Sequence, residues 1–315
     1  MPIVHLTPSD LEARTARAVA AATSAGRALG FDVADPRVLH DQFSVVVHLA
    51  PSPVVVRIPV ALPPGLDGAP QTARQVRELA VVAWLADRGL PVVRPSPLVP
   101  REPVRRDGFS MTFWEYVDVD ASRQPDYIAD AALAADLHAA LRDYPGELPF
   151  LSPLSETVPT CLALLEENPG LLAPADLERL RAEWTVLAPV LSSREGFARV
   201  FPQASLQPIH GDAPSYNVIR TAAGVRYADF EDVNLGPVEW DLAFLGAEGA
   251  AVYDARAAKV GVRPLDPAVL RVMDAAGSLR MVASYALVPQ LPRLAEWLAQ
   301  PLALWRTKPF AGGVG

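Results

Sequence analysis

The sequence predicts an α+β protein with two lobes, a small one built on a short antiparallel sheet and a larger one that is mainly helical. At 315 residues the chain is long enough for two domains of roughly 100–200 residues each. Runs rich in β-branched residues lie before residue 118, whereas apolar residues recur at the spacing of helices after it. We therefore expect one lobe over residues 1–117 and a second over residues 118–315.

The elements expected in the first lobe follow from local signals. Thr7 and Pro8 form a helix start, and that helix should run to about Leu29. The segment Ala-Pro-Ser-Pro predicts a tight turn between two antiparallel strands, which places Ser44 opposite the neighbourhood of Arg57. The elements expected after the first helix are two strands, a helix and a third strand, over 45–49, 54–58, 71–88 and 109–117.

Longer helices are expected in the second lobe. Apolar residues share one face over 127–142 and over 174–191, and Asp266 followed by Pro267 starts a further helix. His138 lies on an otherwise apolar helix, so we interpret it as a core or loop-bracing histidine and not as a proton shuttle.

Composition and charge exclude several classes of protein. With 36 acidic and 28 basic residues the net charge is −8, which argues against a nucleic-acid partner. No apolar run reaches the roughly 18 residues of a membrane span, and the start of the sequence lacks the basic and apolar segments of a signal peptide. The single Cys161 fits a reducing compartment. We expect a cytoplasmic protein that does not bind membranes.

The most informative stretch contains two β-rich runs, at 218–221 and 225–228, that flank a short turn and predict a hairpin. In that register Asn217 lies across from Asp229, with Asp212 a few residues upstream on an irregular loop. Oxygen ligands this close together, with no His or Cys among them, suit Mg²⁺ carrying phosphates better than zinc.

Phosphoryl transfer needs metal ligands that help to neutralise the phosphates and a separate carboxylate that accepts the proton of the attacking hydroxyl. These three residues supply both: Asp212 is the candidate base, and Asn217 and Asp229 are the candidate Mg²⁺ ligands. Their order along the chain is that of the protein-kinase catalytic loop and metal-binding aspartate.

The catalytic segment carries a resemblance to a known family. Gly211 follows His210 where protein kinases have arginine, and Asp-Phe-Glu begins at Asp229. With these features the sequence resembles the aminoglycoside phosphotransferase family of kinase-like small-molecule kinases. The resemblance implies a two-lobed protein-kinase-like fold with a nucleotide-binding first lobe and a catalytic and acceptor-binding second lobe. The later Trp-Asp-Leu-Ala matches a family element, which implies that Asp241, together with His210, supports the catalytic loop.

The resemblance extends to a phosphate anchor in the first lobe. Arg57 lies on the strand where kinases carry the lysine that holds the α- and β-phosphates, and no lysine occurs before Lys259. Glu78 on the following helix is the expected ion-pair partner of Arg57. Pairing of Glu78 with Arg74, one helical turn earlier, is the alternative.

Two further nucleotide contacts are assigned by position. The segment 40–44, which contains no glycine, replaces the glycine-rich loop of kinases, so Ser44 is the expected side-chain donor to a phosphate. Glu115 and Val117 end the last strand of the lobe, and their backbone is the expected hinge that binds adenine. A buried edge strand would carry the same sequence pattern.

The expected function is transfer of the γ-phosphate of ATP or GTP to a hydroxyl of a small molecule, with Mg²⁺ as cofactor. A non-catalytic nucleotide-binding protein is the alternative, favoured by the missing glycine loop and by Arg57. Acids are few in the region 266–305, which favours a neutral or weakly charged acceptor over an aminoglycoside. Glu231 and Asp232, beside the hairpin, either attract a cationic substrate or are simply solvated.

Overall fold

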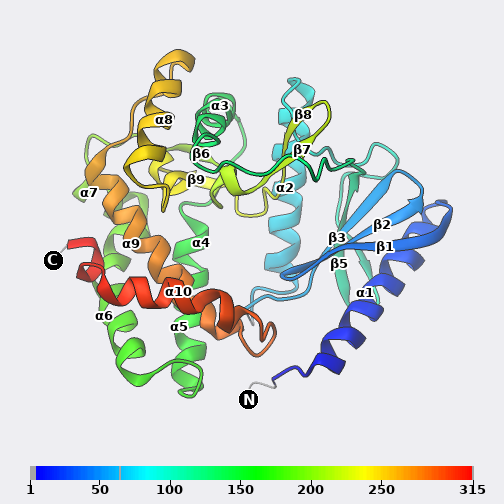
Figure 1. The fold of residues 1–315 in the computed structure, drawn as a ribbon, viewed down its shortest axis with the longest axis horizontal. Helices are drawn as coiled ribbons and strands as arrows, with labels where there is room; N and C mark the ends of the chain where they lie inside the picture. The colour runs from blue at the N-terminus through cyan, green and yellow to red at the C-terminus, as the bar shows by residue number, and fades with distance from the viewer. Residues whose placement is uncertain (1–4, 64, 314–315) are drawn as a thin grey trace. The chain divides into compact units, whose positions relative to one another are not determined.

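The computed structural model describes residues 5–63 and 65–313, and the chain divides into two compact units (Figure 1). Unit 1 comprises Met1–Asp120, Thr221–Arg226 and Leu287–Pro292, and unit 2 comprises Ala121–Arg220, Tyr227–Ala286 and Arg293–Gly315. The boundary expected after residue 117 lies close to the end of the first segment of unit 1. The two later segments of this unit were not expected from the sequence.

Unit 1 contains a five-stranded antiparallel sheet. The strands, in spatial order, are β1 (Val33–Asp41), β2 (Ser44–Pro51), β3 (Val54–Pro59), β5 (Phe109–Glu115) and β4 (Val104–Arg106). The three predicted strands are confirmed as β2, β3 and β5.

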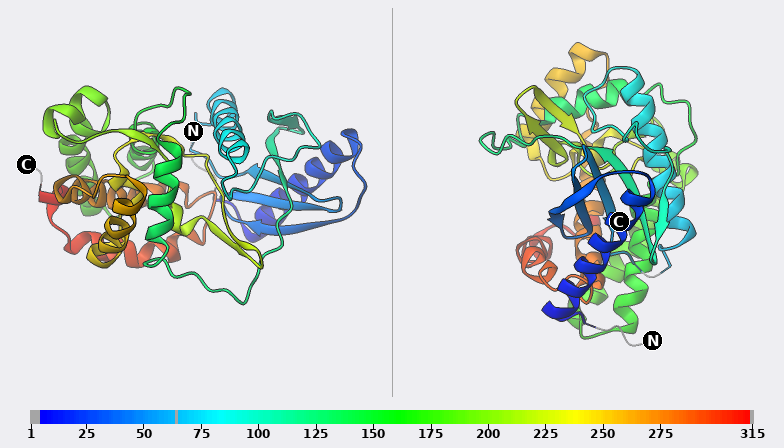
Figure 2. Two further views of the ribbon diagram at one scale, coloured as in Figure 1. Left: turned by 90° about the horizontal axis from the view of Figure 1, so that it is seen from above. Right: turned by 90° about the vertical axis from the view of Figure 1, so that its right-hand side faces the viewer.

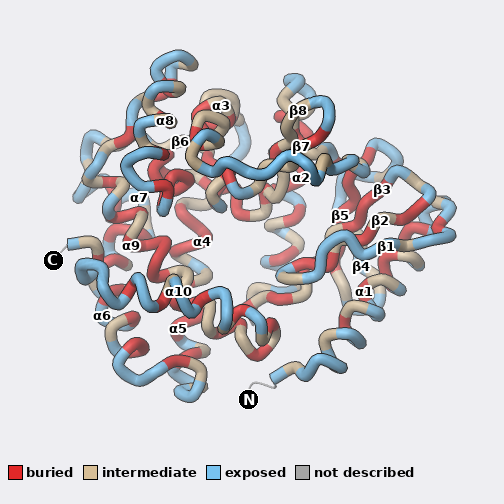
Figure 3. The backbone as a smooth tube through the Cα atoms, viewed as in Figure 1, coloured by how far each residue is buried: buried red, intermediate tan, exposed pale blue. Residues whose placement is uncertain are grey.

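The strands missed by sequence reasoning, β1 and β4, form the two edges of the sheet. β1 includes Asp35, Pro36 and Arg37, and most of its residues are exposed (Figure 3). β4 has only three residues, two of them arginines. Charged residues and proline are common on edge strands, and they remove the apolar alternation by which a strand is recognised.

Two helices accompany the sheet, α1 (Pro8–Ala28) and α2 (Ala69–Asp87). The predicted cap of α1 is present, because Thr7 and Asp10 form a reciprocal capping box. Alanines of α1 pack on one face of the sheet together with alternate residues of β2 and β3, namely Val45, Val47, Leu49, Val54, Val56 and Ile58 (Figure 2). Side chains alternate along a strand, so Arg57 lies on the opposite face.

Unit 2 is mainly helical. Its α-helices are α3 (Ala131–Leu141), α4 (Ser152–Ser155), α5 (Thr157–Glu167), α6 (Pro174–Leu191), α7 (Arg194–Val200), α8 (Gly246–Val260), α9 (Pro267–Ala283) and α10 (Leu294–Thr307). The helix predicted over 174–191 is confirmed as α6, and Asp266 caps α9 by accepting from two backbone N–H groups. The helix predicted from residue 127 begins at Ala131, after a turn. Within the described ranges, none of the helices has the length and apolar character to cross a bilayer.

Cys161 on α5 lies in the core of unit 2 and is fully buried. Burial raises the pKa of its thiol to about 12, so almost no reactive thiolate exists near neutral pH.

We expect no reaction of Cys161 with an aromatic disulfide reagent at pH 8 in the native state. In denaturant one equivalent should react per chain, because Cys161 is the only cysteine. Rapid labelling of the native protein would show that the core around α5 opens readily.

Candidate active site

The candidate catalytic loop, residues 210–217 between β6 and β7, is positioned by a short antiparallel strand pair. β6 (Gln207–Ile209) pairs with β9 (Asn234–Gly236), with Ile209 opposite Asn234. The start of the segment that follows β6 therefore lies beside the end of the segment that precedes β9. This pairing brings His210 and Asp212 next to the stretch from Asp229 to Asp232.

Asp241 holds the beginning of this loop from inside the unit. It lies in the 3₁₀ helix η2 (Val238–Leu242) and is fully buried. Its carboxylate accepts hydrogen bonds from the backbone N–H groups of His210 and Gly211, both at 2.8 Å. Two bonds to one carboxylate fix the position and direction of the loop.

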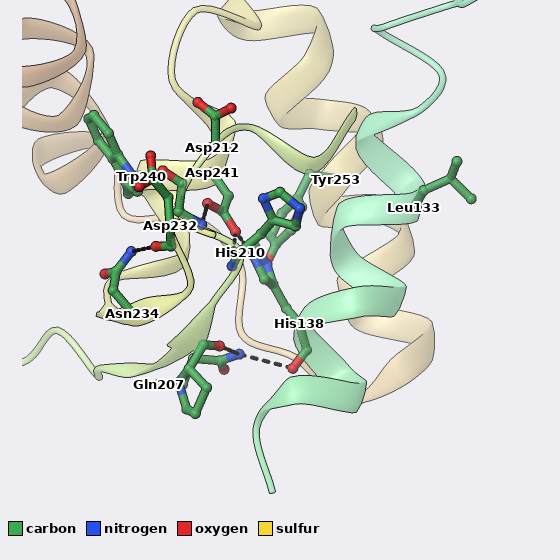
Figure 4. Close-up of polar contacts among 12 residues, drawn as sticks. Leu133, His138, Gln207, His210, Asp212, Asp232, Asn234, Trp240, Asp241 and Tyr253 are labelled. Atoms are coloured by element: carbon green, nitrogen blue, oxygen red, sulfur yellow. Dashed lines mark hydrogen bonds and ion pairs between the residues drawn. The ribbon is translucent and has the colours of Figure 1, made fainter. Parts of the chain in front are cut away.

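His138 supports Asp241 from α3. Its Nε2 lies 2.9 Å from the Asp241 carboxylate and its Nδ1 lies 3.0 Å from the Tyr253 hydroxyl (Figure 4). Because a carboxylate only accepts, Nε2 carries a proton and donates to Asp241. Nδ1 is hydrogen-bonded to the hydroxyl of Tyr253, whose pKa is raised by burial. Both ring nitrogens are satisfied, which agrees with a bracing histidine.

Gly211 allows the loop to pass close to the neighbouring segment. Its φ is +89°, and a Cβ at this position would lie 2.0 Å from the Asp232 carbonyl oxygen and 2.5 Å from Asn234 Nδ2. A side chain here is therefore excluded both by the backbone conformation and by backbone atoms that cannot move away easily.

Asp212 points away from the buried His138 and Asp241 (Figure 4). Its side chain is 49% exposed, and Oδ2 accepts from Asn217 Nδ2 at 3.2 Å. The same Nδ2 donates to the Asp212 carbonyl at 2.7 Å, which fixes the Asn217 amide and directs its oxygen away from Asp212.

The predicted hairpin is confirmed as β7 (Val218–Thr221) and β8 (Gly224–Tyr227). Just beyond it, the Ala228 N–H donates to the Asn217 carbonyl at 3.0 Å, so Asn217 and Asp229 lie at the same end of the hairpin. His210 Nε2 donates to the Ala228 carbonyl at 2.9 Å and its ring packs against Phe230. His210 thus ties the catalytic loop to the segment that carries Asp229.

This end of the hairpin offers oxygen donors for a hard cation, the Asn217 amide and the Asp229 carboxylate. Over the described residues there is no group of three or more His, Cys, Asp or Glu that could enclose a metal ion. Two protein ligands are enough for Mg²⁺, because this ion keeps several waters or phosphate oxygens when it binds through one or two protein groups. They do not fit a structural zinc site.

Sequence reasoning missed Arg280 on α9. Its guanidinium donates to Asp232 at 2.6 Å and lies 3.5 Å from Asp212 Oδ1. Asp232 is buried, so it is neither a solvated surface acid nor free to attract a cationic substrate. The available signal was an arginine inside the otherwise apolar Leu-Arg-Met-Val of α9.

The surroundings shift the ionisation of Asp212. Desolvation by the protein raises its pKa above the usual aspartate value, and the charge of Asp232 acts in the same direction. Arg280 is the main opposing influence, followed by His210 and the hydrogen bond from Asn217. A raised pKa brings a carboxylate closer to the range useful for general-base chemistry.

In unit 1 the structure brings Arg57 and Glu78 together. The Glu78 carboxylate of α2 lies 3.6 Å from the Arg57 guanidinium, and both side chains are largely buried. Ser44 is buried at the start of β2. In the register of β2 and β3 it pairs with Pro59, two residues from Arg57, which pairs with Val46.

The segment expected as a hinge leaves one backbone donor available. The Glu115 N–H donates to the Arg94 carbonyl and the Tyr116 N–H to the Pro53 carbonyl. The Val117 N–H makes no backbone hydrogen bond with the part of the chain that the structure describes.

The loop, the hairpin and Asp241 lie within the part of the chain that a family model matches. A model of the phosphotransferase enzyme family, APH, matches residues 44–286. The chain belongs to this family. Membership confirms the resemblance inferred from the sequence, the kinase-like α+β fold and, at the level of the family, a phosphotransferase with an alcohol group as acceptor. A comparison with curated proteins gives no significant match.

Solved structures of small-molecule kinases share the fold. Amicoumacin kinase hAmiN, solved with AMP-PNP, Ca²⁺ and Ami, matches with a TM-score of 0.61 at 14% identity over 98% of each chain. APH(2″)-IIia with GDP and kanamycin has a TM-score of 0.57 at 14% identity, over 92% of this chain and 97% of that one. Choline kinase LicA from Streptococcus pneumoniae has a TM-score of 0.57 at 16% identity, over 91% and 99%.

The close approach at Gly211 can be tested by unfolding in urea. Gly261→Ala is the matched control, because Gly261 also has a positive φ but a Cβ there meets no atom within 4 Å. The control should lose about 1–2 kcal/mol of stability from backbone strain. Gly211→Ala should lose about 1–3 kcal/mol more, because its Cβ must displace the Asp232 backbone. Equal losses would contradict the close approach.

Proposed function

We propose that this phosphotransferase moves the γ-phosphate of ATP or GTP to a hydroxyl group of a small molecule, with Asp212 as the base and Mg²⁺ held by Asn217 and Asp229. The observation that carries the proposal is the state of the Asp212 carboxylate. The carboxylate is half exposed, and the loop behind it is fixed by Asp241. One of its oxygens accepts from Asn217 and the other forms an ion pair with Arg280.

In the proposed reaction the acceptor oxygen forms a bond to the γ-phosphorus while the bond to the β–γ bridging oxygen breaks. The acceptor proton passes to Asp212, and the nucleoside diphosphate leaves. Bound Mg²⁺ would help to neutralise the charge on the phosphates. The protein contributes positioning and a carboxylate at the attacking hydroxyl, which are the main requirements of this chemistry.

Unit 1 would bind the nucleotide. Arg57 would hold phosphate oxygens with its planar fork, and Glu78 would keep the guanidinium in place, as their 3.6 Å separation allows. The Val117 N–H would donate to the adenine or guanine ring of the nucleotide, and the Glu115 carbonyl would accept from that ring. The Ser44 hydroxyl, at the start of β2, would donate a hydrogen bond to a phosphate.

A neutral or weakly charged acceptor fits the described charges of α9 and its surroundings. Asp266 is engaged in capping α9, and Asp274 accepts from the Phe244 N–H at 2.8 Å. Lys308 adds a cation beside Asp274, where it donates to Ser278. A polycationic aminoglycoside would find few carboxylates here that are not already bound.

The similar structures include proteins named for acceptors of several kinds. They are a choline kinase, an aminopropanol kinase and a kanamycin complex. We therefore propose a panel of amino alcohols, sugars and aminoglycosides as the first acceptors to test. A nucleotide-binding protein without catalysis is the alternative, supported by the absence of glycine from residues 40–44 and by arginine in place of lysine at residue 57.

Metal binding can be tested without knowing the acceptor. ATP should raise the melting temperature more with Mg²⁺ than with a chelator, because a ligand of the native state stabilises it. Asp229→Ala should remove this difference. Glu147→Ala, which removes an exposed acid of the same unit, should keep it. A full Mg²⁺ effect in Asp229→Ala would exclude Asp229 as a ligand.

Catalysis can be tested with Asp212→Asn, which keeps the shape of the side chain but removes the base. Nucleotide binding, measured by calorimetry, should persist, while turnover of any accepted panel compound falls by roughly 10²–10⁴-fold. Unchanged turnover would exclude Asp212 as the base. Nucleotide binding by the wild type with no turnover of any panel compound would favour the non-catalytic alternative.

A further inference from the structure

Arg280 lies beside the proposed base but belongs to a different part of the chain, 69 residues beyond Gly211. One terminal nitrogen of its guanidinium, Nη1, lies 3.5 Å from Asp212 Oδ1 and donates to the Gly211 carbonyl, also at 3.5 Å. The other terminal nitrogen, Nη2, donates to Asp232 Oδ2 at 2.6 Å. A single planar group therefore connects a buried carboxylate to an exposed one.

Arg280 is itself held firmly. The Asp232 side chain is only 5% exposed, and the backbone carbonyl of Asp232 accepts from Asn234. The guanidinium also lies 5.9 Å from the centre of the Trp240 ring, whose Nε1 donates to the Gly211 carbonyl. Its anchors are thus fixed to the strand pair and to the catalytic loop.

We propose that Arg280 is a positioning residue that orients the Asp212 carboxylate for proton transfer through a clamp made of Asp232, Arg280 and Asp212. The inference rests on the proposed role of Asp212 as base. Arg280 forms an ion pair with Oδ1 at 3.5 Å, and Asn217 donates a hydrogen bond to Oδ2 at 3.2 Å. Rotation of the carboxylate is restricted, and its open side remains available to the acceptor hydroxyl.

The geometry requires arginine. The two nitrogens of one guanidinium point to two different carboxylates, whereas the ammonium of lysine is a compact charge on a flexible stem. Lysine at this position could pair with Asp232 but would not hold Asp212 at the same time. A purely structural role for Arg280 would be limited to neutralising the buried Asp232.

The experiment separates these two roles with three variants, Arg280→Ala, Arg280→Lys and the double variant Arg280→Ala/Asp232→Asn. Turnover is measured with whichever member of the panel of amino alcohols, sugars and aminoglycosides the wild type phosphorylates. We expect kcat to fall on the order of 10²-fold in Arg280→Ala, as expected for misplacement of a reacting group, with the KM for ATP nearly unchanged. Added guanidinium at millimolar concentration should restore part of the kcat, and Arg280→Lys should restore little.

The double variant decides between positioning and structure. Arg280→Ala leaves Asp232 buried without its arginine and should lower the Tm, and Asp232→Asn in addition should recover much of that loss. The kcat should remain low in the double variant. Recovery of kcat together with Tm would show a structural role only and overturn the proposal. Arg179→Ala is the control, because it leaves the buried Glu183 without its arginine in the same unit and should lower Tm but not kcat.

A separate measurement keeps the inference distinct from the proposed function. The Tm losses of Asp212→Ala, Arg280→Ala and their double variant form a cycle that needs no turnover. Non-additive losses would support the contact between the two side chains, and additive losses would overturn it. Failure of the wild type to phosphorylate any panel compound would favour the non-catalytic alternative, while the cycle would still decide whether Arg280 interacts with Asp212.

Discussion

The candidate active site depends on one buried carboxylate. Asp241 is inaccessible to solvent and accepts from the His210 N–H, from the Gly211 N–H and from the His138 imidazole. Without these bonds two backbone donors would be buried without an acceptor, at a cost of about 1–3 kcal/mol for each such group. This cost stabilises the observed position of the loop, in which both donors are satisfied.

Exposure increases from Asp241 through Asp232 and Arg280 to Asp212. The exposed fractions of the side chains rise from 0% for Asp241 through 5% for Asp232 and 25% for Arg280 to 49% for Asp212. Asp241 and Asp232 are buried, where hydrogen bonds are strong and side chains are rigid, Arg280 is partly buried, and the Asp212 carboxylate that would react is open to solvent. One loop can in this way be both rigid and accessible.

The sequence predicts the local part of this site and not the distant part. Asp212, Asn217 and Asp229 lie within one loop and hairpin, whose spacing alone brings them together. The ion pair of Arg280 with Asp232 joins segments that only the packing of α9 brings into contact, and in the sequence Asp232 resembles a solvated acid. Arg57 and Glu78 are an intermediate case, because strand alternation and the following helix predict their meeting without its distance. The edge strands β1 and β4 were missed because they lack a buried, alternating face.

The braces of the catalytic loop involve backbone groups and buried side chains, so they place no requirement on the acceptor. Solved structures with this fold include a kanamycin complex, a choline kinase and an amicoumacin kinase, at 14–16% identity to this chain. In this chain α9 carries Arg280 and also Asp274 and Ser278, which contact Phe244 and Lys308 respectively. If the acceptor binds against α9, its recognition and the orientation of the base share one helix. A substitution that repacks α9 for a new acceptor must then also preserve the contact of Arg280 with Asp212, which restricts how the acceptor site can change.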